Sequence, residues 1–252
     1  MKAQFRVIIP AAGQGSRSGL NYPKSLHPVG GIPILVRLFR ILTAYDDTPV
    51  LVINSTFHDL FKSTLSQYGF KAEFVFQDMP SGMGHALLQA DPCINEETEI
   101  ILAWSDIALL SPLTVHHLVN CHLMAENTFS LVTALSNNCY TIVRREKGAL
   151  KAVIETRAEG ISPLEWGERD IGLFVFKNRP VFQILENLPF YSEKTGKKEL
   201  GFLYVIEHLV RTGEKCEAYP IALDTDVLSF NDPEDLVEIE QKGRSSGLFN
   251  TK

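Results

Sequence analysis

A glycine-rich segment near the start of the chain carries the residues with the clearest chemical meaning. Residues 11–17 read Ala-Ala-Gly-Gln-Gly-Ser-Arg, follow the short β-branched run Phe5–Ile9 and are soon followed by Lys24. Glycines let the main chain approach an anion closely, and its N–H groups, with Arg17 and Lys24, are able to hold a triphosphate. A plain surface turn with two cations would not need so many special residues in one place.

Two common phosphate-binding loops are excluded by the residues themselves. The chain has no GxxxxGK[ST] pattern, so it is not a P-loop protein. The GxGxxG fingerprint of dinucleotide-binding proteins fails because Ser18 stands where the third glycine belongs, and Asn54 rather than an acid ends the next strand. An enzyme that uses a nicotinamide cofactor is therefore not expected.

Asp106 is the candidate ligand for a metal ion. It follows the apolar run Ile100–Trp104, which predicts a central strand with Asp106 at its carboxyl edge, where open α/β sheets bind ligands. A hard carboxylate in that place suits Mg²⁺. The alternative is an aspartate that caps a helix or closes a turn.

Gln77 is a candidate for contact with a nucleobase. It lies between the run Ala72–Phe76 and the loop Gly82-Met83-Gly84, and a side-chain amide is able to read the edge of a base. The alternative is a glutamine that faces solvent.

These residues fall between helices and strands that alternate along the first half of the chain. Apolar spacing predicts helices over Ile32–Tyr45, Phe57–Tyr68 and Gly84–Ala90, and strands over Phe5–Ile9, Pro49–Ile53, Ala72–Phe76 and Glu99–Trp104. This alternation predicts an α/β fold with a doubly wound, mostly parallel mixed sheet that has helices on both faces.

The second half contains more strands and looks like an inserted or appended sheet region. Strands are predicted over Phe129–Leu135, Tyr140–Arg144, Leu150–Glu155 and Ile171–Phe176, and helices over Leu200–Thr212 and Pro233–Gln241. We expect one domain over residues 1–245, with a nucleotide-binding half (1–125), a half that binds the second substrate (126–245) and a tail (246–252).

The composition of the chain indicates which partners to expect and where in the cell the protein is located. The 252 residues have a formal net charge of −6, which argues against a nucleic-acid binder. The four cysteines form no CxxC pair, so reduced thiols and a cytoplasmic location are expected. No apolar stretch approaches the ~20 residues of a membrane span, so no membrane partner is expected. The oligomeric state stays open, with a homo-oligomer as one option.

Several motifs together resemble the sugar-phosphate nucleotidyltransferases, also called sugar nucleotide pyrophosphorylases. Gly13-x-Gly15-Ser16-Arg17 with Pro23-Lys24 is similar to the GxG[TS]R…PK signature of that family. Further similar segments extend nearly end to end: Pro28–Ile34, Gly82–Ala86, Trp104-Ser105-Asp106, Glu155, Gly172 and Asn231–Leu236. The resemblance includes the N-terminal domain of acetylglucosamine-1-phosphate uridylyltransferases and capsule-biosynthesis members whose sugars vary.

The resemblance implies a glycosyltransferase-A-like, Rossmann-like domain and a Mg²⁺-dependent reaction. A sugar 1-phosphate would attack the α-phosphorus of a nucleoside triphosphate, with UTP favoured and CTP or another nucleotide as alternatives, and pyrophosphate would leave. The product, a nucleotide sugar, would serve synthesis of capsule or another cell-surface polysaccharide. Catalysis would rest on positioning and charge neutralisation, without a covalent nucleophile.

The resemblance also assigns roles to individual residues. Arg17 would stabilise the departing pyrophosphate and Lys24 would contact the phosphate undergoing substitution, while Asp106 and Asn231 would hold Mg²⁺. The remaining assignments are nucleotide contacts at Ala11, Ala12, Gly13, Gly15, Ser16, Gln77, Gly82 and Met83, and sugar-phosphate contacts at Thr141, Glu155, Arg157 and Asp170. For Asn231 the alternative is a cap on the helix that starts near Pro233.

This sequence departs from the family pattern at several of these positions. Met83 stands where a threonine is usual, Ser105 where a glycine precedes the metal aspartate, and Thr141 where the acetylglucosamine enzymes have a sugar-contacting glycine. Arg157 occupies the place of a phosphate-binding lysine, and Asp170 that of an asparagine. These changes affect the identity of the sugar most.

Two other functions remain as alternatives. A glycosyltransferase of the same architecture would normally carry a DxD motif, but Trp104 stands two positions before Asp106. A non-catalytic nucleotide-binding homologue would fit the changes at Met83 and Ser105, although it would not need Arg17, Lys24 and Asp106 together.

Overall fold

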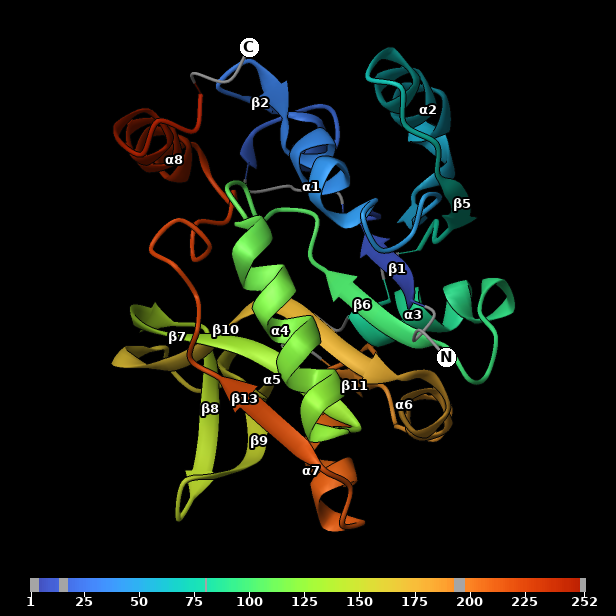
Figure 1. The fold of residues 1–252 in the computed structure, drawn as a ribbon, viewed down its shortest axis with the longest axis vertical. Coiled ribbons are helices and arrows are strands. Elements are labelled where there is room, and N and C mark those ends of the chain that lie inside the picture. The colour runs from blue at the N-terminus through green and yellow to red at the C-terminus, as the bar shows by residue number, and fades with distance from the viewer. Residues whose placement is uncertain (1–4, 14–17, 80, 193–197, 250–252) are drawn as a thin grey trace.

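A twisted seven-stranded sheet forms the centre of the molecule (Figure 1). The computed structural model describes residues 5–13, 18–79, 81–192 and 198–249. The strand order is β13 (Cys216–Tyr219), β7 (Phe129–Cys139), β10 (Leu164–Lys177), β6 (Glu99–Ala103), β1 (Phe5–Pro10), β4 (Val50–Ile53) and β5 (Glu73–Phe76). Only β10 among these runs antiparallel to its two neighbours, so the sheet is mixed but mostly parallel, as predicted.

Helices cover both faces of this sheet. One face packs against α1 (Ile34–Leu42), α2 (His58–Gln67) and α4 (Pro112–Ala125). The other face packs against α3 (Met83–Ala90), α6 (Asn178–Leu185) and α7 (Tyr204–Arg211). Neighbouring residues of β1 alternate between the two cores, with Ile8 in one and Val7 and Ile9 in the other, which is why residues 7–9 are all apolar.

Smaller elements surround the central sheet. A separate ribbon is formed by β8 (Thr141–Glu146) and β9 (Ala149–Glu155), and the short helix α5 (Thr156–Glu159) follows it. Two further pairs are β2 (Pro28–Val29) with β3 (Ile32–Pro33), and β11 (Tyr191–Ser192) with β12 (Lys198–Glu199). The helix α8 (Pro233–Ser245) ends the described fold.

Most predicted elements are present, and the differences have physical causes. The first predicted helix starts only at Ile34, because Ile32–Pro33 pairs as β3. The strand predicted over Ile171–Phe176 forms only the second half of β10. The first half of β10, which was not predicted, pairs with β7. The sequence did not predict β13 or α6, which are short, and α6 carries Pro180 in its first turn.

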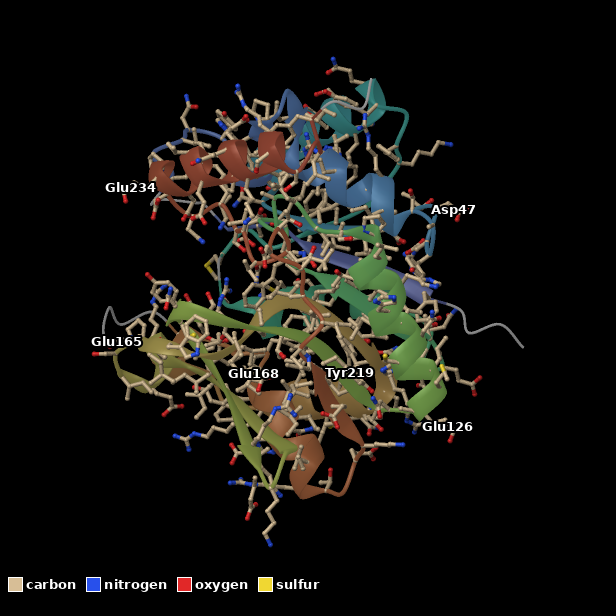
Figure 2. The ribbon with its side chains drawn as sticks, turned by 60° about the vertical axis from the view of Figure 1, so that its left-hand side comes forward. Asp47, Glu126, Glu165, Glu168, Tyr219 and Glu234 are labelled. Atoms are coloured by element: carbon tan, nitrogen blue, oxygen red, sulfur yellow. The ribbon has the colours of Figure 1, made fainter. Side chains whose placement is uncertain are left out.

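The surface charge is dispersed. In Figure 2 the exposed acidic residues Asp47, Glu126, Glu165 and Glu234 lie at separate places on the periphery. No helix among residues 5–13, 18–79, 81–192 and 198–249 combines the length and the apolar character needed to cross a membrane.

An irregularity in β10 sets the position of the residues after β6. The pairing of β10 with β7 shifts between Asp170 and Phe174, and Gly172 there has φ +84°. A Cβ on Gly172 would lie 2.7 Å from the Trp104 ring, and the Gly172 carbonyl accepts from the Trp104 N–H at 2.9 Å. Only glycine allows the Trp104 ring to lie flat against this bend.

We therefore expect Gly172→Ala to destabilise the fold more than replacing a glycine that has the same positive φ but no close neighbour. Gly213 is the matched control, because its φ is +85° but nothing lies within 4 Å of its would-be Cβ. Gly213→Ala should lower the free energy of unfolding by about 1–2 kcal/mol, and Gly172→Ala by about 1–3 kcal/mol more because of overpacking. Urea unfolding measures both, and equal losses would show that Trp104 moves aside without cost.

Candidate active site

The predicted phosphate-binding segment leaves the carboxyl edge of the sheet between two parallel neighbours. β1 lies between β6 and β4, and the Ala11 N–H continues the pairing by donating to the Val52 carbonyl at 2.7 Å. Ala11 and Ala12 are buried and Gly13 is exposed, beside a cavity of about 320 Å³. Gly15, Ser16 and Arg17 lie outside the described residues, so their predicted roles stay predictions.

Three polar side chains that are distant in sequence meet at this edge. Lys24 Nζ donates to Asp106 Oδ2 at 2.5 Å and to Asn231 Oδ1 at 3.2 Å. The Lys24 and Asp106 side chains are 20% and 15% exposed, so the ion pair is largely shielded from water. The structure thus brings together the predicted catalytic lysine and both predicted metal ligands.

Backbone pairing holds the Asn231 segment against the end of β6. Ile107 and Ser229 form an isolated antiparallel bridge, with Phe230 N–H donating to the Asp106 carbonyl at 3.0 Å. Asp226 anchors the same segment, because its buried carboxylate accepts from the Ser111 and Leu223 N–H groups at 2.6 and 2.7 Å. Burial raises the pKa of Asp226, and its hydrogen bonds oppose that shift.

The N-cap of α8 is Asp232 and not Asn231. Asp232 accepts from the N–H groups of Glu234 and Asp235, and Asp235 in return accepts from the Asp232 N–H, which completes a capping box. The interpretation of Asn231 as the cap is therefore wrong, because the helix begins one residue later than that role requires. The Asn231 side chain is instead directed at Lys24.

The residues at this point fit a Mg²⁺ ion. Asp106 Oδ1 is buried and has no hydrogen-bond partner among the described residues, while Asp106 Oδ2 and Asn231 Oδ1 both face Lys24. Carboxylate and amide oxygens are ligands of the hard type that Mg²⁺ takes. The described part of the chain holds no cluster of three or more His, Cys, Asp or Glu ligands.

Gln77 is buried at the end of β5 and is held by two acceptors. Its Nε2 lies 3.1 Å from the Gly82 carbonyl oxygen and 2.8 Å from His85 Nδ1, and the side chain is 5% exposed. Gln77 is therefore not the solvent-facing glutamine of the alternative interpretation. Met83 opens α3 and packs against the core, so its side chain does not replace the polar contact of the family's threonine.

Three of the predicted sugar-phosphate residues lie together near the β8–β9 ribbon. Thr141 pairs with Glu155 across the ribbon and donates its hydroxyl to Asp170 Oδ1 at 2.5 Å. Asp170 Oδ2 accepts from the Gly172 N–H at 2.9 Å. Asp170 is only 2% exposed and burial raises its pKa, so its carboxylate mainly orients Thr141. Arg157 lies on α5, directly after Glu155 and Thr156.

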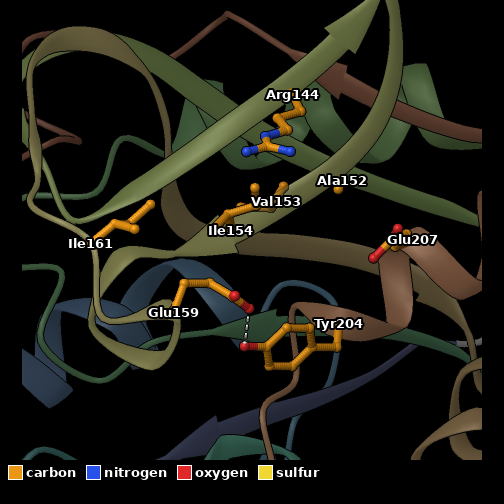
Figure 3. Close-up of a pocket in the computed structure, with 8 residues that line it drawn as sticks. All are labelled: Arg144, Ala152, Val153, Ile154, Glu159, Ile161, Tyr204 and Glu207. Atoms are coloured by element: carbon orange, nitrogen blue, oxygen red, sulfur yellow. Dashed lines mark hydrogen bonds between the residues drawn. The ribbon is translucent and has the colours of Figure 1, made fainter.

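A second cavity on this side involves residues that the sequence did not single out. It has a volume of about 290 Å³ and lies between the β8–β9 ribbon, α5 and α7 (Figure 3). Tyr204 donates to Glu159 Oε1 at 2.9 Å and so ties α7 to the helix that follows Glu155. Burial and the Glu159 carboxylate raise the pKa of Tyr204. Neither residue belongs to a recognisable motif, so only the tertiary structure reveals this contact.

With this geometry in place, comparison with known proteins identifies the family. The sequence profile of the MobA-like NTP transferase domain matches residues 7–169, from β1 into β10. The chain belongs to the MobA-like NTP transferase domain family. The matched region includes Lys24, Gln77, Asp106 and Glu155 and ends before Asn231.

Curated relatives and a solved structure agree with this membership. The chain is 28% identical over 229 residues to the bifunctional protein GlmU of Streptococcus gordonii, covering 89% of this chain and 49% of that protein. It is 26% identical over 236 residues to the GlmU of Acetivibrio thermocellus, covering 92% and 50%. The chain thus spans about half the length of these relatives.

A solved structure shares the fold. The UDP-glucose pyrophosphorylase complexed with UDP-glucose superposes with a TM-score of 0.74 at 16% identity, covering 97% of this chain and 99% of that one. The predicted fold class is confirmed by this similarity.

The cap assignment yields a stability prediction for this NTP transferase domain. Asp232→Ala removes the side chain that accepts from the first turn of α8, which should cost about 1 kcal/mol and lower Tm by about 2–4 °C. Asn231→Ala is the control and should leave Tm nearly unchanged. Differential scanning calorimetry measures both variants, and an equal fall in Tm would mean that Asn231 supports the cap after all.

Proposed function

We propose that this NTP transferase domain transfers a nucleotidyl group from a nucleoside triphosphate to a sugar 1-phosphate and releases pyrophosphate. The observation that carries the proposal is the meeting of Lys24, Asp106 and Asn231 at the edge from which the glycine-rich segment leaves the sheet. The similar proteins support the sugar-phosphate class, since one solved structure with this fold is a UDP-glucose pyrophosphorylase.

The residues would act through position and charge. An oxygen of the sugar phosphate attacks the α-phosphorus, the bond from that phosphorus to the bridging oxygen of the β-phosphate breaks, and pyrophosphate leaves with the electron pair. Lys24 is held at this edge by Asp106 and Asn231, so its ammonium is already placed to meet phosphate charge without reorganisation. Arg17 would stabilise the pyrophosphate that departs.

Asp106 and Asn231 are the proposed protein ligands of Mg²⁺. When bound, the ion would neutralise charge on the phosphates and help to align them. The buried, unpartnered Oδ1 of Asp106 supports this assignment, because leaving such an oxygen without a donor costs free energy unless it gains a partner.

On the substrate side, we propose UTP as the nucleotide and Glu155 as a partner of sugar hydroxyls. The buried and held amide of Gln77 supports base recognition at the end of β5. Thr141 and Asp170 support the sugar site, since they hold the ribbon that carries Glu155. A cytoplasmic role in making the nucleotide sugar for a capsule or another cell-surface polysaccharide fits this activity.

Pyrophosphate release is the direct test. The protein is mixed with Mg²⁺, each of the common nucleoside triphosphates and a panel of sugar 1-phosphates, and release is followed by a coupled colour assay. Turnover that requires both substrates supports the proposal. Nucleotide binding without turnover on a broad panel would instead favour the non-catalytic homologue, which the changes at Met83 and Ser105 keep as an alternative.

If Asp106 and Asn231 bind Mg²⁺, replacing Asp106 should have a larger effect on activity than replacing Asn231. Asp106→Asn should reduce Mg²⁺-dependent turnover by about a hundred-fold or more, because it removes a charged ligand, with the circular dichroism spectrum unchanged. Asn231→Ala should raise the Mg²⁺ concentration for half-maximal rate several-fold. Asp224→Asn makes the same chemical change at an 89% exposed side chain and should have neither effect. Near-normal activity of Asp106→Asn would remove that residue from the site.

The sugar-side assignment predicts a selective loss. Glu155→Gln should raise the KM for the sugar phosphate about ten-fold, because a charged hydrogen-bond acceptor is lost, and leave nucleotide affinity unchanged. Glu165→Gln, on an exposed part of β10, serves as the control. Steady-state kinetics with each substrate varied separately measures both, and a large loss of nucleotide binding would contradict the assignment.

A further inference from the structure

The environment of Gln77 fixes which way its side-chain amide faces. One neighbour of Gln77 Nε2, at 3.1 Å, is the carbonyl oxygen of Gly82, which only accepts hydrogen bonds. The same oxygen also accepts from the Ala86 N–H at 3.2 Å in the first turn of α3. The Gln77 atom beside it must therefore be the NH₂ group and not the oxygen.

The second neighbour of this NH₂ group is the His85 ring. His85 Nδ1 lies 2.8 Å from Gln77 Nε2, so Nδ1 has to accept, and the ring proton has to be on Nε2. His85 Nε2 faces the exposed side chain of Gln89 at 3.4 Å, where an amide oxygen is able to accept that proton once the Gln89 amide makes a half turn. Both hydrogens of the Gln77 NH₂ group are then in use.

The residues that hold Gln77 are themselves fixed in place. Gly82 has φ +93°, and a Cβ there would lie 2.6 Å from the Leu200 carbonyl oxygen. Leu200 pairs with both sides of this loop, donating to the Ser81 carbonyl and accepting from the Gly84 N–H, each at 2.8 Å. These contacts hold Ser81, Gly82 and Gly84 beside Leu200, where the Gly82 carbonyl and His85 face the amide together.

This leaves the oxygen of Gln77 as the group that is free to meet a ligand. No described residue donates to Gln77 Oε1, and this atom is not among the side-chain atoms that are buried without a partner. A fixed acceptor selects a base that carries a proton on the facing ring nitrogen. Uracil does so at N3, whereas cytosine has a lone pair at the same position.

We infer that His85 is a positioning residue for nucleotide selection: by accepting from Gln77 it keeps the amide oxygen turned toward the nucleobase, and so favours uridine over cytidine nucleotides. The inference rests on the proposed function for the place where the base binds. It assigns to the histidine of α3 a role that acts through Gln77 and needs no contact with the substrate. Without the Nδ1 acceptor, only the Gly82 carbonyl still holds the NH₂ group, so the turned-over amide, which offers its NH₂ group to the cytosine lone pair, costs less free energy to reach.

The test separates the effect of the shape of the His85 ring from the effect of its hydrogen-bond acceptor, Nδ1. His85→Phe keeps a ring and removes the acceptor, His85→Leu repeats the removal in a smaller side chain, and His85→Asn restores an acceptor close to the position of Nδ1. Gln89→Leu is the control, because it changes only the partner of the other ring nitrogen. The dissociation constants of UTP and CTP are measured by calorimetry with Mg²⁺, and kcat and KM are measured for each nucleotide.

We expect the wild-type protein to bind UTP more tightly than CTP. In His85→Phe and His85→Leu, the preference for UTP, given as the Kd of CTP divided by the Kd of UTP, should fall about ten-fold. The loss of preference should appear in Kd and KM and not in kcat. His85→Asn should recover most of the preference for UTP, and Gln89→Leu should keep it. The inference would be overturned if the His85 variants lost affinity equally for UTP and CTP, or if their preference for UTP stayed unchanged. It would also be overturned if the wild-type protein preferred CTP. Because the binding arm needs no turnover, the inference is tested even if pyrophosphate release fails.

Discussion

The contact of Lys24 with Asp106 and Asn231 is the interaction on which the site depends. Lys24 is 82 residues from Asp106 and 207 from Asn231 in sequence, so no local pattern brings them together. The parallel pairing of β1 with β6 does so first, because it places the loops after both strands at the same edge. The segment that bridges Ile107 to Ser229 then adds Asn231.

This arrangement makes the C-terminal segment part of the candidate site, although the family match ends at residue 169. The segment holds its place through the hydrogen bonds of Asp226 and through the capping box of Asp232 and Asp235. β10 joins the same sheet beside β6. The nucleotide and sugar halves expected from the sequence therefore share one sheet and one cluster of charges.

The sequence predicted what local chemistry determines and missed what depends on tertiary contacts. Residues 7–9 and 100–103 are continuous apolar runs in buried strands, and these strands were found. The edge strand Cys216–Tyr219 is short, contains a charged residue and is mostly only half-buried, and it was not found. Asn231 and Asp232 are equally good caps by residue type, so only the backbone shows which one begins α8. The Gln77 amide lies against the His85 ring and the Gly82 carbonyl, and no spacing rule in the sequence indicates the contact with His85.

Asp226 and Asp106 differ in how their carboxylate oxygens are satisfied. Asp226 is 0% exposed, and its two oxygens accept from Ser111, Leu223 and Thr114, so its desolvation is offset within the fold. Asp106 has an ammonium at one oxygen and no partner among the described residues at the other. A buried acceptor without a donor costs about 1–3 kcal/mol, and nearby donors would remove that cost. This fold offers three donors to Asp226 and none among the described residues to Asp106 Oδ1, so this oxygen is the atom that we propose as a ligand of Mg²⁺.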